Sequence, residues 1–168
     1  MVKKLLPLGN APVVGYQHHA YLLSIMSGHR DFSAWLACNY IQLQFQFVNR
    51  GSLNFYGIHK LYPFLEEIYV RKSLLRSYIP GQTFLIDCIA GGWYAVTFAN
   101  EFHIPDRNAF QQYHMVHDIM VHGYDLDKRL FYIAGYKRDQ TFGSSSVQMK
   151  PFIQALEDFA DREGDMVK

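Results

Sequence analysis

Three of the eight histidines of the chain lie close together, at His114, His117 and His122. Imidazole serves as a metal ligand or a general base, because its ordinary pKa lies near 6.5. The spacing His-x2-His-x4-His matches no established zinc motif, although zinc takes three or four such ligands and His18 or His19 would complete a set. The three residues are therefore candidate metal ligands. Hydrogen-bonded pocket or surface histidines are the alternative.

One acidic residue is placed to assist His117. Glu101 follows Asn100 at the end of an apolar segment, one loop before His117. A carboxylate at that place would orient the imidazole through a hydrogen bond. The alternative is a strand end whose side chains face solvent.

Nucleophilic side chains are few. Cys88 lies late in a predicted helix, whereas thiolates form at helix N-termini, so we expect it to be buried as a small hydrophobe. Cys38 is similarly placed, but a loop that starts there would expose it. The run Gly143-Ser144-Ser145-Ser146 lacks the Gly-x-Ser-x-Gly elbow of serine hydrolases, and we expect a polar loop there.

A β-hairpin is the element that must position the histidines. Two apolar and aromatic runs, residues 119–124 and 130–134, flank the polar turn Asp125-Leu126-Asp127-Lys128. Runs of this length that are rich in β-branched and aromatic residues predict paired strands around such a turn. His117 then lies at the mouth of the hairpin, just before its first strand.

The remaining chain predicts helices early and strands later. Residues 1–16 contain four Pro and Gly residues and indicate an irregular arm. Apolar residues alternate with glutamine over residues 40–47, which predicts a half-buried strand. Helices are expected over residues 17–26, 32–38, 63–78, 82–90, 108–113 and from 149 onward, with further strands over residues 53–58 and 93–100. This order indicates an α+β fold with an antiparallel sheet.

The composition is that of one globular domain over residues 1–168. With 49% hydrophobic and 18% charged residues the chain can bury a core, and disorder is not expected. A net charge of +1 argues against a nucleic-acid surface, which requires clustered Lys and Arg. The apolar run after Met1 is too short for a signal peptide or a membrane span, and two cysteines cannot build a disulfide framework. We therefore expect a reduced, cytoplasmic protein with no membrane or nucleic-acid partner.

Several short motifs resemble the family of the N-terminal domain of butirosin-biosynthesis protein H. They are Gly91-Gly92-Trp93-Tyr94 before a strand, Ile104-Pro105, Tyr113 with His114 and His117, and Gly123-Tyr124-Asp125. That domain is similar to the papain-like peptidases that process bacteriocin leaders, so the resemblance implies a papain-like α+β fold. It also implies a role in antibiotic or peptide natural-product biosynthesis, where the butirosin protein moves an acyl group from a carrier protein to an amine.

The resemblance also implies catalytic roles. A papain-like site needs a Cys thiolate at a helix N-terminus, a His at a strand start, and an Asn or Asp that orients the His. His117 matches the His by position. The helix start carries His18-His19 with no cysteine near it, and the returning strand carries Ala134-Gly135 where the orienting residue is expected. The candidate catalytic residues are therefore His117, His18, His19 and Glu101, and we expect no cofactor.

Three functions are compatible with these residues. The first is transfer or hydrolysis of an acyl or peptidyl chain bound to a carrier protein, with His117 deprotonating the attacking amine directly. The second is a non-catalytic papain-like module that binds a carrier protein or synthetase of a biosynthetic assembly line. The third is a small metalloprotein that uses His114, His117 and His122.

Overall fold

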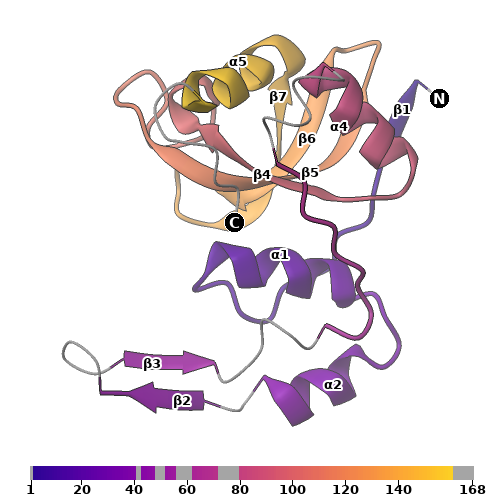
Figure 1. Ribbon diagram of the computed structural model, residues 1–168, viewed down its shortest axis with the longest axis vertical. Helices are drawn as coiled ribbons and strands as arrows, with labels where there is room; N and C mark the ends of the chain where they lie inside the picture. The colour runs from indigo at the N-terminus through magenta and orange to yellow at the C-terminus, as the bar shows by residue number, and fades with distance from the viewer. Residues whose placement is uncertain (1, 41–42, 48–51, 56–61, 72–79, 161–168) are drawn as a thin grey trace.

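The computed structural model of the protein describes residues 2–40, 43–47, 52–55, 62–71 and 80–160 (Figure 1). Along the chain lie β1 (Lys3–Leu5), α1 (Gln17–Met26), α2 (Phe32–Asn39), β2 (Leu43–Gln46), β3 (Ser52–Phe55), α4 (Gly81–Ala90), β4 (Ala95–Asn100), the 3-10 helix η2 (Glu101–His103), β5 (Val116–Asp125), β6 (Leu130–Tyr136), β7 (Phe142–Gln148) and α5 (Met149–Ala160).

The fold is α+β, as predicted, and is built on a curled antiparallel sheet. β1, β5, β6 and β7 follow one another across this sheet, and β4 pairs with β5 as well. β4 lies against residues 116–121 of β5 and β1 against residues 123–125, so both share one edge of the longest strand. β2 and β3 form a separate two-stranded sheet, which Figure 1 shows below α1 and beside α2.

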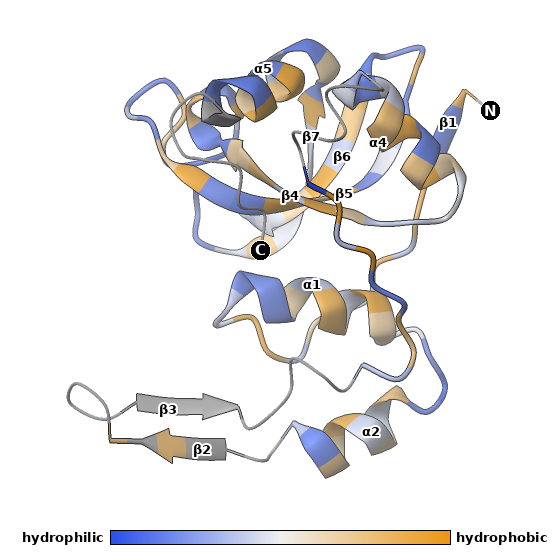
Figure 2. Ribbon diagram, viewed as in Figure 1, coloured by the Kyte–Doolittle hydropathy of each residue, from blue (hydrophilic) through white to orange (hydrophobic). Residues whose placement is uncertain are grey.

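Helices cover both faces of the curled sheet. α4 and α5 pack on one face, where Ile89 and Phe152 are fully buried against Ile119, Val121 and Ile133. α1 packs on the other face through Tyr21, which is buried with Met120 and Ala134. The alternation of hydrophilic and hydrophobic residues along α5 is visible in Figure 2 and explains why this helix lies flat on the sheet.

The predicted hairpin is confirmed as β5 and β6. Its turn is closed by a hydrogen bond of 3.0 Å from the Lys128 N–H to Asp125 Oδ1, and Arg129 adopts a left-handed φ of 54°. The register shifts between Val121 and Gly123, so His122 is the extra residue of a β-bulge. The bulge redirects the histidine side chain within the sheet.

Two segments expected to be irregular form strands. Lys3–Leu5, inside the predicted arm, adds to the edge of β5 that β4 leaves open. The serine run, expected as a loop, is the middle of β7, where Ser144, Ser145 and Ser146 pair in register with β6. Strand formation depends on the neighbouring strand as much as on local preference, and β6 supplies that neighbour.

Two predicted helices are wrong where the structure describes them. Residues 62–71 form a turn followed by a segment without regular secondary structure, and Tyr62, Phe64 and Leu65 pack against the side chains of α1 and α2. Residues 72–79 of this prediction lie outside the described ranges. Residues 108–112 form consecutive turns rather than a helix, since left-handed φ values at Asp106 and Gln111 interrupt the backbone.

The alternating strand is confirmed over Leu43–Gln46, but its burial is not. Phe45 is 53% exposed and Phe47 is 90% exposed, so these rings do not form a buried face. The helices predicted at residues 17–26, 32–38 and 82–90 are present as α1, α2 and α4. Among the residues with described positions, no helix combines the length and apolarity that crossing a membrane requires.

Candidate functional site

His117 lies at the start of β5 in direct contact with its own neighbour, Asp118. The imidazole Nδ1 is 2.8 Å from Asp118 Oδ1, and the His117 side chain remains 34% exposed. This hydrogen bond, reinforced by the charges of Asp118 and Glu101, outweighs burial and raises the pKa of His117 to about 8. The structure therefore contains a His–Asp pair with access to solvent.

The contacts of His117 determine which ring nitrogen is available for chemistry. Nδ1 is also 3.0 Å from Gln17 Nε2, but an amide N–H can donate to Nδ1 only when that nitrogen carries no proton. Bonding to the Asp118 carboxylate requires the proton on Nδ1, so the neutral ring keeps its lone pair on Nε2. Nε2 is therefore the atom of His117 that would accept a proton.

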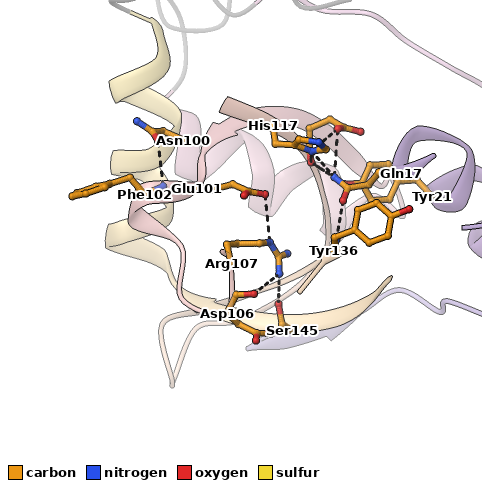
Figure 3. A network of polar contacts seen from close by, with 11 residues as sticks. Gln17, Tyr21, Asn100, Glu101, Phe102, Asp106, Arg107, His117, Tyr136 and Ser145 are labelled. Carbon is orange, nitrogen blue, oxygen red and sulfur yellow. Dashed lines mark hydrogen bonds and ion pairs between the residues drawn. The ribbon is translucent and has the colours of Figure 1, made fainter. Parts of the chain in front are cut away.

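Gln17, the first residue of α1, connects this helix to the histidine. Its Nε2 donates to the backbone carbonyl of Asp118, and its Oε1 accepts a 2.7 Å hydrogen bond from the Tyr136 N–H of β6. Tyr21, one turn later, donates through its hydroxyl to the same Asp118 carbonyl at 3.0 Å. Both side chains are buried, and Figure 3 shows them beside His117. The N-terminal turn of α1 is thus fastened to the strand that carries His117.

A buried arginine extends the polar cluster. Arg107 is 1% exposed; its Nε lies 3.9 Å from Glu101 Oε1, and its Nη1 donates to the Asp106 carbonyl at 3.3 Å (Figure 3). Its Nη2, like Asp118 Oδ2, is buried and has no hydrogen-bond partner among the described residues. Burial lowers the pKa of the Arg107 guanidinium and raises the pKa of Glu101. The charge of each residue shifts the pKa of the other in the opposite direction, but burial is the larger effect.

Gly135 leaves room for this cluster. A β-carbon at that position would lie 3.3 Å from Arg107 Nη2, 3.3 Å from Gln17 Oε1 and 3.4 Å from Tyr21 Oη. Side chains from α1 and from the loop after β4 therefore converge on a β6 residue that lacks a side chain. The papain-like resemblance predicts an orienting residue at this position. Gly135 instead makes room for the side chains of Arg107, Gln17 and Tyr21.

The other two candidate histidines lie in different surroundings. His122 is buried, with Nε2 2.8 Å from Ser144 Oγ and Nδ1 3.3 Å from the Leu6 carbonyl, and burial lowers its pKa. His114 stacks on Phe102 and lies 3.5 Å from Asp158 of α5. In the part of the chain that the structure describes, no three or more His, Cys, Asp or Glu side chains form a group able to hold a metal ion.

The remaining candidates are placed as follows. His18 is exposed and His19 is 4% exposed, with their rings 4.4 Å apart, and the contacts of α1 with His117 run through Gln17. Glu101 acts on His117 through its charge, whereas the hydrogen-bonded carboxylate is that of Asp118.

Neither cysteine takes the place of the expected thiolate. Cys38 is exposed near the end of α2, which is the alternative to burial that the sequence left open. Cys88 is partly buried near the end of α4, and burial together with Asp87 raises its pKa. Both residues lie near helix C-termini, where a thiolate is disfavoured.

Three contributors to the site were missed from the sequence. Gln17 begins a correctly predicted helix, but nothing in the sequence indicates where its amide points. Asp118 was overlooked because neighbouring strand residues ordinarily face opposite sides. Arg107 lies in a loop with no recognisable pattern. Comparison with known proteins adds no relative, since no family model, curated protein or solved structure matches the chain.

Proposed function

We propose that the chain acts on an acyl or peptidyl group bound as a thioester to a carrier protein of natural-product biosynthesis, with His117 as general base. The observation that carries this proposal is the partly exposed His117, hydrogen-bonded at 2.8 Å to Asp118. A papain-like arrangement is part of the proposal. It is supported by a histidine at a strand start, an antiparallel sheet, and the N-terminal turn of α1 next to that histidine. A reduced, cytoplasmic setting is also part of the proposal, because two cysteines cannot build a disulfide framework.

The reaction we propose is aminolysis of the thioester without a protein thiol. The acceptor amine attacks the acyl carbon, and His117 Nε2 takes the proton that the amine loses. A C–N bond forms and the C–S bond breaks, and the same proton passes from Nε2 to the departing sulfur of the carrier. Asp118 stabilises the imidazolium that exists between these two steps, as acids in triads do.

A second candidate is a non-catalytic module that binds the carrier protein or its synthetase. With a pKa of about 8, His117 is neutral in only about a tenth of the molecules at pH 7. A base that is mainly protonated at neutral pH is weak, whereas an imidazolium suits the recognition of an acidic partner. The two candidates use the same residue and differ in whether turnover occurs.

Turnover and binding should be measured on the same variants. Acyl N-acetylcysteamine thioesters imitate the end of a carrier arm, and amide formation with a primary amine is followed by mass spectrometry. Wild type is compared with His117→Gln and with His29→Gln, an exposed control. We expect amide formation that rises with pH toward and above about 8 and is lost only in His117→Gln. Binding of a loaded carrier protein without turnover would favour the module, and neither binding nor turnover would contradict the proposal.

Thiol alkylation against pH separates this mechanism from cysteine catalysis. Cys88 should react slowly because burial raises its pKa, and exposed Cys38 should react faster. Replacing His117 with Ala should change neither rate. A cysteine that reacts fast well below its ordinary pKa, and loses this reactivity without His117, would establish a Cys–His pair and replace the proposed mechanism.

A further inference from the structure

Asn100, the last residue of β4, uses both ends of its side-chain amide. It is 1% exposed, and its Oδ1 accepts hydrogen bonds from the N–H groups of Phe102 at 3.2 Å and Met115 at 3.3 Å. Its Nδ2 donates to Asp158 Oδ2 at 2.8 Å and lies 2.9 Å from His114 Nδ1. One buried side chain therefore contacts the end of β4, the approach to β5, and α5.

The two backbone groups bound by Asn100 Oδ1 lie at opposite ends of residues 101–115, the segment between β4 and β5. A backbone hydrogen bond of 2.8 Å from the Glu101 N–H to the Met115 carbonyl closes the same loop. The segment brings Glu101 and Arg107 into the polar cluster, and His117 follows its end by two residues. The placement of the cluster thus depends on how the ends of this segment are joined.

Two residues of the segment have an uncommon backbone conformation. Asp106 and Gln111 both have left-handed φ values, 65° and 54°, which L-residues rarely adopt. Arg107 is a buried charge whose only carboxylate neighbour among the described ion pairs is 3.9 Å away. Strained backbone and a poorly paired buried charge persist only when surrounding structure holds them, and they cluster at functional sites.

We infer that Asn100 is a positioning residue for His117, joining the two ends of the 101–115 segment and anchoring them to Asp158 of α5. An amide suits this position because one atom must accept from two N–H groups while the other donates to a carboxylate. An aspartate would accept hydrogen bonds from the two N–H groups equally well, but its second carboxylate oxygen would face the carboxylate of Asp158 and repel it. The inference rests on the proposed function, in which His117 is the general base.

The test follows the His117 ring by NMR through its Cε1–H shift against pH. In Asn100→Asp, repulsion from Asp158 should loosen the segment, withdraw the support of Glu101, and lower the pKa of His117 from about 8 toward its ordinary value. We expect a fall of a few tenths of a pH unit, roughly a twofold weaker hold on the proton, because the charge of Glu101 is the smallest contribution that raises this pKa and the hydrogen bond to Asp118 remains. The double variant Asn100→Asp/Asp158→Asn exchanges donor and acceptor and should restore the pKa. The single control Asp158→Asn retains an oxygen for the Asn100 amide and should leave the pKa near its wild-type value.

An unchanged His117 pKa in a folded Asn100→Asp protein would overturn the inference and leave Asn100 as an anchor of α5 alone. If Asn100→Asp does not fold, Asn100→Ser provides the same test. A serine hydroxyl cannot at once accept the hydrogen bonds from the N–H groups of residues 102 and 115 and donate to Asp158 of α5. An unchanged pKa in that variant would likewise overturn the inference. The measurement needs no substrate, so it is decided whether or not His117 proves to be catalytic.

Discussion

The Oε1 atom of Gln17 accepts a 2.7 Å hydrogen bond from the backbone N–H of Tyr136, joining the first residue of α1 to the last residue of β6. The Nε2 atom of the same amide donates to the Asp118 carbonyl in β5. A single buried side chain therefore holds α1 against two adjacent strands. Together with the Tyr21 hydroxyl, it positions the helix over the His–Asp pair.

Replacing Gln17 with Ala should destabilise the protein by about 1–3 kcal/mol, because the half-buried Tyr136 N–H loses its acceptor and the Asp118 carbonyl keeps only the Tyr21 hydroxyl as a side-chain donor. Chemical denaturation checks this value. Gln82→Ala, at an exposed position of α4, is the matched control and should change stability by less than about 0.5 kcal/mol. Equal effects of the two substitutions would show that the Gln17 amide does not hold α1 to the sheet.

Gly135 and Gly143 are direct partners in the β6–β7 ladder, yet a methyl group should affect them differently. At Gly135 it would press on Arg107, Gln17 and Tyr21 at 3.3–3.4 Å, whereas at Gly143 it would meet only the flexible Lys137 side chain, at 3.5 Å. Gly135→Ala should therefore cost about 1–3 kcal/mol of unfolding free energy and Gly143→Ala much less. Paired thermal and denaturant unfolding measures the difference. A Gly143→Ala protein as unstable as Gly135→Ala would mean that the sheet alone disfavours a side chain there.

The raised pKa of His117 links its protonation to stability. The folded protein holds the proton more tightly than the unfolded chain, with a pKa of about 8 against an ordinary 6.5. The stabilisation is fully present below about pH 6.5 and is lost as pH rises through 8. The stability difference between wild type and His117→Gln, from denaturation at pH 6 to 9, should therefore shrink across this interval. A difference that stays constant with pH would show that Asp118 does not stabilise the imidazolium.

The sequence predicted the elements that depend on local pattern. The helix over residues 17–26 and the hairpin of β5 and β6 follow from apolar periodicity and a polar turn, and both are present. β7 was missed because a serine run has little strand preference of its own, and its conformation depends on pairing with β6. Residues 65–71 were taken for helix because of their apolar spacing, but only Leu65 packs on α1 and α2, whereas Ile68 and Tyr69 are exposed.

The candidate site was predicted only at its centre. His117 could be found because it precedes a strand, but the acid that contacts it is Asp118 rather than Glu101. Adjacent strand residues meet here at the beginning of β5, next to Gln17, and alternation gives no signal for such a contact. Arg107 and Gln17 come from a loop and a helix far away in sequence. Their convergence beside Gly135 is a tertiary property that no short motif encodes.

The pairing of Arg107 with Glu101 is measurable by a double-mutant cycle. Glu101→Gln leaves the buried guanidinium without its anion and should cost about 3–5 kcal/mol. Arg107→Met leaves the partly buried Glu101 carboxylate without its cation and should cost less. The double variant removes both charges and should lose less than the sum of the two by about 1–3 kcal/mol.

Lys137 and Asp139 provide the control cycle, because their charged atoms are also 3.9 Å apart but their side chains are 30% and 62% exposed. Solvent screens this pair, so Lys137→Met and Asp139→Asn should show no measurable coupling in the same denaturation experiment. If coupling is found only between Arg107 and Glu101, the burial of the pair, and not the 3.9 Å distance between its charged atoms, makes the ion pair strong. Additive effects at Arg107 and Glu101 would mean that the two charges are not paired.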